Sequence, residues 1–319
     1  MIFLLIFFLT ILLFWMFAPR EPADLKVNFD EEQLRSDLDS YLQVSEAKMQ
    51  DIVPGTEKRI VWHGKAHQKT PVSIVYLHGF SASSEEIRPV PDQVAQSLGA
   101  NLYFARLTGH GRSGEAMADA TVAIWMHDTA EALAIGRRIG ARVLLISTST
   151  GGTLSAAAAC DPILSKAVAG MVFVAPNFGV NNAAARLLTW PFARTWIPLL
   201  VGRERRVETL SPEHGRFWTN IYPIVATLPM AALVRKVIRK NFSKVSIPAF
   251  FIMSEKDQVV RPDMIERIAK CWGGQKQVLK VVPGPNDDAE AHVLAGDILS
   301  PDLTQQVVEK ILDWFKSIK

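Results

Sequence analysis

Residues 143–160 of the chain read VLLISTSTGGTLSAAAAC. The first four residues form an apolar run of strand length, and the small residues of a closely packed helix begin at Gly152. Between them Ser149 occupies the apex of a sharp turn, where only small residues fit two positions before and after. Ser147 and Gly151 meet this requirement, so the stretch has the G-x-S-x-G pattern of a nucleophile elbow with serine in the first glycine position. A Ser/Thr-rich loop before a helix has the same pattern, so the interpretation depends on partners elsewhere.

Strands and helices alternate on both sides of this stretch. Further apolar runs of strand length lie at residues 72–77, 101–105, 169–175, 248–253 and 278–282. Helical patterns lie at residues 85–98, 123–139, 262–271 and 301–318. Short strands that are apolar on both sides, separated by helices, predict an α/β fold with a mostly parallel sheet and helices on both faces. Because ligands of such sheets bind at the carboxyl ends of the strands, we expect functional residues there.

Candidate partners for Ser149 follow other strands of the predicted sheet. A serine hydroxyl is a weak nucleophile unless a base, held by an acid, removes its proton. His292 follows the last strand and is the candidate base. Asp257, in the loop after the preceding strand, is the candidate acid, and Glu255 is the alternative.

Two backbone amides are candidates for an oxyanion hole. The segment Leu77-His78-Gly79-Phe80 follows the first long strand, where a turn can point the N–H of Phe80 at a substrate carbonyl. The N–H of Thr150, directly after Ser149, is the second candidate donor. His78 would then serve the turn and not act as the base.

In these residues the chain resembles the α/β-hydrolase superfamily over about residues 57–319, and most of all its monoacylglycerol lipase, lysophospholipase and small carboxylesterase group. The residues that carry the resemblance are His78-Gly79-Phe80, GHGRSG at 109–114, Ser147 to Gly151, the Asp257 loop and His292. The resemblance implies an α/β-hydrolase fold with a helical cap inserted after the strand that follows the nucleophile helix. Ser147 departs from the family pattern and puts the geometry of the elbow in question.

The resemblance also divides the chain. We expect a linker and amphipathic helix at 20–56, a core formed by 57–177 and 247–319, and a cap at 178–246. The cap holds eleven Lys or Arg and three acids, a net charge of +8, so the rest of the +3 chain carries −5. A solvated face, contact with anionic lipid and binding of an anionic substrate are three interpretations of this charge. The cap is rich in large apolar residues, and its candidate substrate-pocket residues are Trp190, Trp196 and Trp218.

Residues 2–18 read IFLLIFFLTILLFWMFA, with one polar residue. This run predicts a transmembrane anchor at 1–19 and a single-pass membrane localisation. A cleaved signal peptide is the rival, but no basic residue precedes the run and no A-x-A site follows it. Arg20, Lys26 and Arg35 all follow the run. By the positive-inside rule this distribution weakly favours a cytoplasmic globular part, and the side of the membrane stays open.

Composition excludes several classes of protein. With 49% apolar and 21% charged residues the chain is not disordered. Two cysteines, Cys160 and Cys271, provide neither a disulfide framework nor a CxxC metal site. We expect no metal, no organic cofactor and no nucleic-acid partner, and the sequence does not indicate an oligomeric state.

The sequence therefore predicts a membrane-anchored serine hydrolase that cleaves carboxylic esters, such as monoacylglycerols or lysolipids, through an acyl-enzyme. Its expected partners are a small acyl ester and membrane lipid. A thioesterase, an acyltransferase or an amidase would use the same triad, because only the leaving group or the acceptor differs. A non-catalytic, tethered binding protein is a separate alternative, since the fold alone does not decide function.

Overall fold

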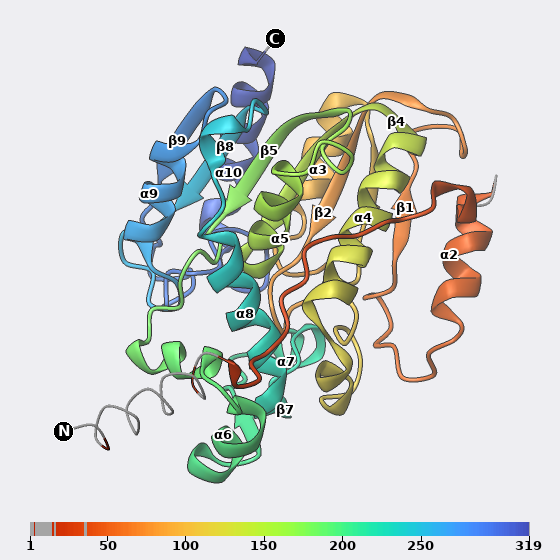
Figure 1. The fold of residues 1–319 in the computed structure, drawn as a ribbon. Helices are drawn as coiled ribbons and strands as arrows, with labels where there is room; N and C mark the ends of the chain where they lie inside the picture. Colours follow the sequence, from red (N-terminus) through yellow and green to blue (C-terminus); the bar gives the residue numbers. More distant parts are fainter. Residues whose placement is uncertain (1–2, 4–14, 16, 35–36, 319) are drawn as a thin grey trace.

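The structure is a computed structural model that describes residues 3, 15, 17–34 and 37–318. Its centre is a seven-stranded sheet with the strand order β1-β3-β2-β4-β5-β8-β9. The strands are β1 (Arg59–Val61), β2 (Thr70–Leu77), β3 (Asn101–Phe104), β4 (Gly140–Thr148), β5 (Val168–Val174), β8 (Ala249–Met253) and β9 (Lys276–Lys280). β1 pairs antiparallel with β3, and the other pairs are parallel. The predicted mostly parallel sheet is confirmed (Figure 1).

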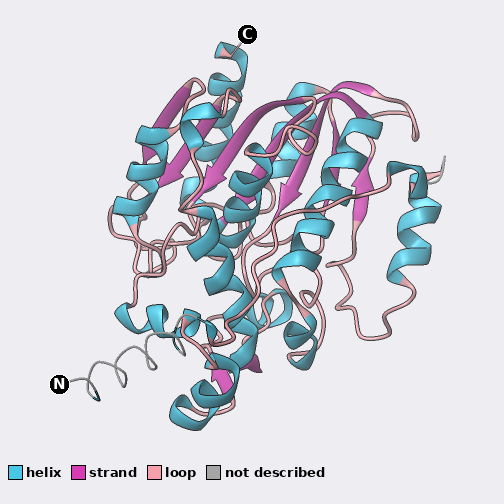
Figure 2. Cartoon of the chain, in the orientation of Figure 1, coloured by secondary structure: helices cyan, strands magenta, loops and turns pink. Residues whose placement is uncertain are grey.

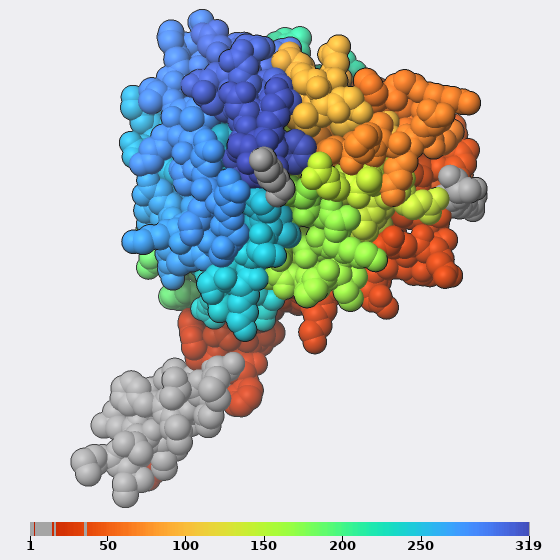
Figure 3. All heavy atoms as spheres, turned by 90° about the horizontal axis from the view of Figure 1, so that it is seen from above, coloured from red at the N-terminus to blue at the C-terminus, as the bar shows by residue number. Residues whose placement is uncertain are grey.

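Helices cover both faces of the sheet. Successive strand residues point to opposite sides, and because the central strands are largely apolar on both sides, both faces must be buried. In β4, Val143 and Leu145 pack into one buried cluster, whereas Leu144 and Ile146 pack into another. On the first side lie α2 (Leu38–Glu46), α4 (Val122–Ile139), α5 (Ser149–Ala159), α8 (Thr227–Val237) and α9 (Pro262–Cys271). On the second side lie α3 (Val90–Leu98) and α10 (Pro301–Ser317), whose surfaces adjoin in Figure 3.

The segment between β5 and β8 lies beyond the carboxyl ends of the strands, around α6, α7 and β7 in Figure 1. Before α8 it holds η3 (Ala183–Thr189), α6 (Ala193–Val201), β6 (Glu204–Arg206), α7 (Pro212–Phe217), β7 (Ile221–Pro223) and η4 (Ile224–Ala226). The segment is mostly helical, but β6 and β7 pair as a small antiparallel sheet (Figure 2). Its last α-helix, α8, packs into the main core through Leu233 and Val237, and the short 3-10 helix η5 (Phe242–Lys244) follows before β8.

The segment before α2 is an extended strap that is fastened at both ends. Glu21 accepts two hydrogen bonds of 2.7 Å from Arg194 in α6. Farther along, the ring of Phe29 lies 5.2 Å from that of His127 in α4. Between these points apolar side chains of the strap, such as Leu25, pack on the main core. The predicted linker thus lies on the body of the protein.

The predicted single-pass membrane localisation is corrected by the structure. A helix that crosses a bilayer needs about 20 predominantly apolar residues. The longest helix in the described part of the chain, α4, has 18 residues and contains Asp128, Glu131, Arg137 and Arg138. No helix among the described residues is long and apolar enough to cross a membrane. Most of the predicted anchor, residues 1–2, 4–14 and 16, lies outside the described residues.

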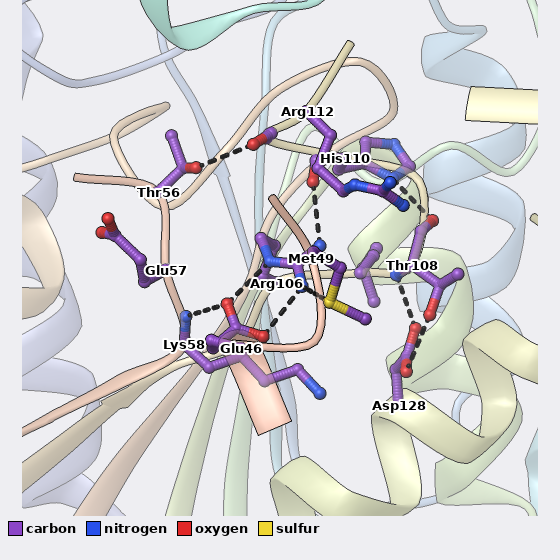
Figure 4. A network of polar contacts seen from close by, with 12 residues as sticks. Glu46, Met49, Thr56, Glu57, Lys58, Arg106, Thr108, His110, Arg112 and Asp128 are labelled. Atoms are coloured by element: carbon purple, nitrogen blue, oxygen red, sulfur yellow. Dashed lines mark hydrogen bonds and ion pairs between the residues drawn. The ribbon is translucent and has the colours of Figure 1, made fainter. Parts of the chain in front are cut away.

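A buried ionic cluster fastens α2 to the edge of the sheet (Figure 4). The carboxylate of Glu46 accepts two hydrogen bonds of 2.8 Å from the guanidinium of Arg106, which follows β3. Beside it, the ammonium of Lys58 lies 2.5 Å from the carboxylate of Glu131 in α4. Burial alone raises the pKa of Glu46, but the bonds and charge of Arg106 outweigh burial and hold that pKa below its usual range. Each buried charge of the cluster is therefore stabilised by an opposite charge beside it.

Arg106 also supports the loop with the GHGRSG sequence. Its guanidinium donates to the backbone carbonyl of His110 over 3.1 Å. The ring of His110 lies 5.7 Å from that of Phe80, edge to face. The loop therefore packs the ring of His110 against Phe80, the residue that carries the first predicted oxyanion amide.

Glu46→Ala should lower the free energy of unfolding by about 3–5 kcal/mol, because it leaves the buried guanidinium of Arg106 without its ion-pair partner. Urea unfolding measures this value. The control is Glu255→Ala, which breaks an exposed pair with Lys280 and should change the free energy by less than about 1 kcal/mol. Equal losses in the two variants would show that the buried cluster contributes no more than a surface pair.

Candidate active site

The elbow at Ser149 has the strained geometry that its sequence predicts. The chain passes from β4 directly into α5, and the backbone of Ser149 has φ +48°, in the left-handed region. A Cβ at Gly151 would overlap the carbonyl oxygens of Leu77 and His78, so glycine is required there. Ser147 is accommodated because its hydroxyl donates to the carbonyl of Val172 in β5 over 3.2 Å. The departure from the family pattern thus leaves the elbow intact.

The structure brings Ser149, His292 and Asp257 together. Nε2 of His292 lies 3.0 Å from Oγ of Ser149, and Nδ1 lies 2.9 Å from Oδ2 of Asp257. All three residues are buried, with 3–8% of their surface exposed. A hydroxyl, an imidazole and a carboxylate in this order form the relay that activates a serine nucleophile.

Backbone amides hold the acid in place. The other carboxylate oxygen of Asp257, Oδ1, accepts hydrogen bonds of 2.8 Å from the N–H groups of Val259 and Val260. This leaves Oδ2 directed at the histidine. Glu255, the alternative acid, is exposed and pairs with Lys280 over 2.6 Å. Of the two sequence candidates, Asp257 is the one that contacts His292.

Asp288 holds the histidine loop. From the sequence we expect a solvated loop acid that lies close to His292 and can affect the pKa of that residue, and its bonds to the backbone are not foreseen. Its Oδ2 accepts hydrogen bonds from the backbone N–H groups of His292, at 3.0 Å, and Val293, at 2.8 Å. The residue is 9% exposed, and its own N–H donates to the hydroxyl of Ser300. An Asp four residues before the histidine is a weak signal in the sequence, because acidic loop residues are usually solvated.

Charge around His292 favours its protonated form. Burial by itself lowers the pKa of the imidazole, but the hydrogen bond and the charge of Asp257 oppose this effect. The charges of Glu86 and Asp288 act in the same direction as Asp257, and the net pKa lies above its usual value. A carboxylate partner of this kind stabilises the imidazolium that a general base becomes during the reaction.

The two predicted oxyanion donors belong to segments that adjoin Ser149. Thr150 is the second residue of α5, so its N–H has no acceptor within the helix. Within the described residues the N–H of Phe80 donates to no protein acceptor. A Cβ on Gly79 would lie 3.1 Å from the Cβ of Ser149, so the turn that carries Phe80 adjoins the nucleophile. Both amides are therefore available to a ligand beside Ser149.

His78 is committed to the turn. Its Nδ1 lies 2.8 Å from the carbonyl oxygen of Gly79, and its Nε2 accepts the N–H of Leu107 over 3.1 Å. Burial lowers the pKa of His78 to about 4. This imidazole therefore stays neutral and bonded on both sides.

The three cap tryptophans have different surroundings. Trp190 is 45% exposed, and its ring contacts Trp15 at 5.2 Å and Trp196 at 6.4 Å. Trp196 donates its N–H to the carbonyl of Pro191. Trp218 is buried in the same cluster as Val293, the residue after the histidine. The ring contacts thus join Trp190 to Trp196 and Trp15, and Trp218 to His214 in α7. Among the described residues they place none of the three tryptophans against Ser149 or His292.

Tyr222, in β7, is one of the large apolar residues of the predicted cap but is not one of its three candidate pocket residues. Its ring lies 5.4 Å from that of Phe80, edge to face, and both belong to a small apolar cluster with Met117. No periodic pattern marks a single aromatic residue in a short strand, so only the folded structure reveals its contact with Phe80. These side chains form an apolar wall above the oxyanion turn.

Among the described residues, one cluster of acids and histidine could hold a metal ion. Asp37, Asp39 and His67 lie near one another by α2 and the turn before β2, and all are exposed. The cluster contains no residue of the Ser149 site.

A family profile described as "Serine aminopeptidase, S33" (Hydrolase_4) matches residues 68–285. No curated protein matches the chain. Among solved structures, the chain is similar to the metagenome-derived lipolytic enzymes LipS and LipT, with 21% identity and a TM-score of 0.65 over 83% of this chain and 99% of the other.

Two monoglyceride lipases are also similar in structure. The monoacylglycerol lipase of Paleococcus ferrophilus has 14% identity and a TM-score of 0.55, over 82% of this chain and 100% of the other. A soluble variant of the monoglyceride lipase of Saccharomyces cerevisiae has 14% identity and a TM-score of 0.56, over 82% and 91%. At such low sequence identities, the structural similarity shows that the fold is shared and nothing more. Together with the family match over most of the core, it shows that this chain belongs to the Hydrolase_4 family of serine hydrolases and has the α/β-hydrolase fold.

Proposed function

We propose that this protein hydrolyses carboxylic esters through an acyl-enzyme formed on Ser149. The observation that carries the proposal is the unbroken hydrogen-bond chain from Ser149 through His292 to Asp257. Membership of a serine hydrolase family and a fold shared with lipases and monoglyceride lipases support it.

The proposed reaction has two halves. Oγ of Ser149 attacks the ester carbonyl while Nε2 of His292 takes the hydroxyl proton. The N–H groups of Phe80 and Thr150 stabilise the oxyanion, and the proton then passes from His292 to the departing alcohol. In the second half, a water gives one proton to Nε2 of His292 as it attacks the acyl carbonyl. His292 then returns this proton to Oγ of Ser149 as the Ser149–acyl bond breaks, and the acyl group leaves as the carboxylic acid. Asp257 keeps the imidazole oriented and stabilises its charged form.

For the substrate we propose an acyl ester of the monoacylglycerol or lysolipid type. The wall formed by Phe80, Met117 and Tyr222 is apolar and adjoins the proposed oxyanion hole. Apolar walls with few polar groups favour a substrate that buries a hydrocarbon chain.

Cleavage of an amide is the second candidate. The observation that favours it is the description of the matching family, which names serine aminopeptidases. The same residues would form the acyl-enzyme, with an amine as the leaving group. Thioesterase and acyltransferase activities also share this intermediate, so product analysis with ester, thioester and amide analogues of one acyl group distinguishes all four.

The full-length protein should hydrolyse 4-nitrophenyl esters, with higher kcat/KM for octanoyl than for acetyl, because the longer chain contacts the apolar wall. Ser149→Ala and His292→Ala should each reduce kcat by on the order of 10⁴ to 10⁶, and the double variant should be little worse. Steady-state kinetics across chain lengths provide the test. A folded wild-type protein without turnover, or with turnover that survives Ser149→Ala, would refute the proposed chemistry, and equal rates for acetyl and octanoyl would refute the substrate class.

Activity should fall as the pH is lowered through the pKa of His292, because the protonated imidazole cannot accept the serine proton. Since that pKa is raised, the midpoint in kcat/KM should lie above 6.5. Asp257→Asn should reduce kcat by on the order of 10⁴ and move the midpoint to lower pH, since the amide has no charge. The pH dependence of kcat/KM for both proteins measures the shift. An unchanged midpoint in Asp257→Asn would exclude the carboxylate as its cause.

A further inference from the structure

Glu86 is a buried carboxyl beside the site that the mechanism above does not use. It lies between β2 and α3, is 3% exposed, and directs Oε2 at two donors. The backbone N–H of Gly79 donates to it over 2.7 Å, and the hydroxyl of Tyr76 donates over 2.9 Å. Gly79 directly precedes Phe80, whose N–H is the first proposed oxyanion donor.

The same hydrogen-bond chain continues to the elbow. The hydroxyl of Tyr76 lies 3.1 Å from Oγ1 of Thr148, the residue before Ser149. A Cβ on Gly79 would meet Oε1 of Glu86 at 2.5 Å and the Cβ of Ser149 at 3.1 Å. The oxyanion turn is thus held between the carboxyl of Glu86 on one side and the nucleophile on the other.

Glu86 lacks the cationic partner that usually accompanies a buried acid. Its neighbour Glu85 accepts hydrogen bonds from the guanidinium groups of Arg59 and Arg88. Within the described residues, the carboxyl of Glu86 has only the neutral donors of Gly79 and Tyr76. Burial raises the pKa of Glu86 to about 7, although these donors and the charge of His292 favour its ionised form. A carboxyl is costly in such a place, and an apolar side chain could not bond the turn.

We propose that Glu86 is a positioning residue for the oxyanion hole, which fixes the turn of Gly79 and Phe80 and ties it through Tyr76 to the elbow of Ser149. The inference rests on the proposed hydrolase function. Within the described residues, the hydrogen bonds of the Glu86 carboxyl go to Gly79 and Tyr76 and not to Ser149 or His292, so it acts through the direction of the Phe80 N–H.

This role has a kinetic signature. An oxyanion-hole donor stabilises charge that develops in the transition state, so its misplacement reduces kcat and leaves KM nearly unchanged. Loss of one such donor costs about 10²- to 10³-fold in kcat, and a misdirected donor should cost less. A residue needed only for stability would lower the melting temperature without this division between kcat and KM.

The test compares Glu86→Ala with Glu86→Gln. The alanine variant should lose about 10- to 100-fold in kcat on a 4-nitrophenyl ester, with KM within about 3-fold of wild type. In Glu86→Gln the amide oxygen still accepts from Gly79 and Tyr76, so kcat should stay within about 3-fold. The matched control is Glu85→Gln, which changes the adjacent carboxyl and should leave kcat unaffected.

A second variant and a second measurement keep the test decisive. If Glu86→Ala does not fold, Tyr76→Phe removes only the bond to the elbow and should lower kcat by about 3- to 10-fold. Amide hydrogen exchange of the peptide that covers residues 78–81 needs no turnover. It should be faster in Glu86→Ala and restored in Glu86→Gln.

Separate results overturn the inference and the proposed function. An active wild type with full kcat in Glu86→Ala, or equal losses in the Ala and Gln variants, overturns the role of Glu86 alone. An inactive wild type refutes the proposed function. If the wild type is inactive, amide exchange at residues 78–81 still tests the positioning role. Exchange that is unchanged in Glu86→Ala overturns that role. Exchange that is faster in Glu86→Ala and returns to the wild-type rate in Glu86→Gln supports the contact with the turn.

Discussion

The left-handed backbone of Ser149 is the constraint on which the site depends. The turn at Ser149 places its Oγ at the end of β4. It also makes α5 start close to the end of β2, where a side chain at Gly151 would overlap the carbonyl oxygens of Leu77 and His78. Because β2 and β4 are parallel neighbours, the turn after β2 comes to lie beside the nucleophile. One strained residue thus positions both the hydroxyl and the helix amide that follows it.

Three buried carboxyls organise the loops around this point, and backbone amides are prominent among their donors. Asp257 accepts from the amides of its own loop, Asp288 from the amides of the histidine loop, and Glu86 from the oxyanion turn. Each carboxyl fixes a loop that has no regular structure. The charges of all three raise the pKa of His292, so the groups that hold the loops also favour the imidazolium that the proposed mechanism requires.

The sequence was sufficient for the sheet, the elbow and the order of Ser149, Asp257 and His292, because strand ends in a parallel sheet converge whatever the loops contain. It could not identify the role of Glu86, nor the burial of Asp288 and its bonds to the histidine loop, since the sequence does not distinguish a buried acid from a solvated one. The contact of Tyr222 with Phe80 likewise joins residues far apart in the chain. The predicted membrane localisation is overturned because no helix within the described residues could cross a bilayer, and most of the predicted anchor lies outside those residues.

The central claim is that Ser149 is the nucleophile activated by His292. A fluorophosphonate probe, which bonds covalently to activated serines, tests it without knowledge of the substrate. The account predicts one adduct on the tryptic peptide 143–166, assigned by fragmentation to Ser149 and not to Ser147 or Ser155, and almost none in His292→Ala. An adduct on another residue, or labelling of Ser149 that is equally fast in His292→Ala, would contradict it.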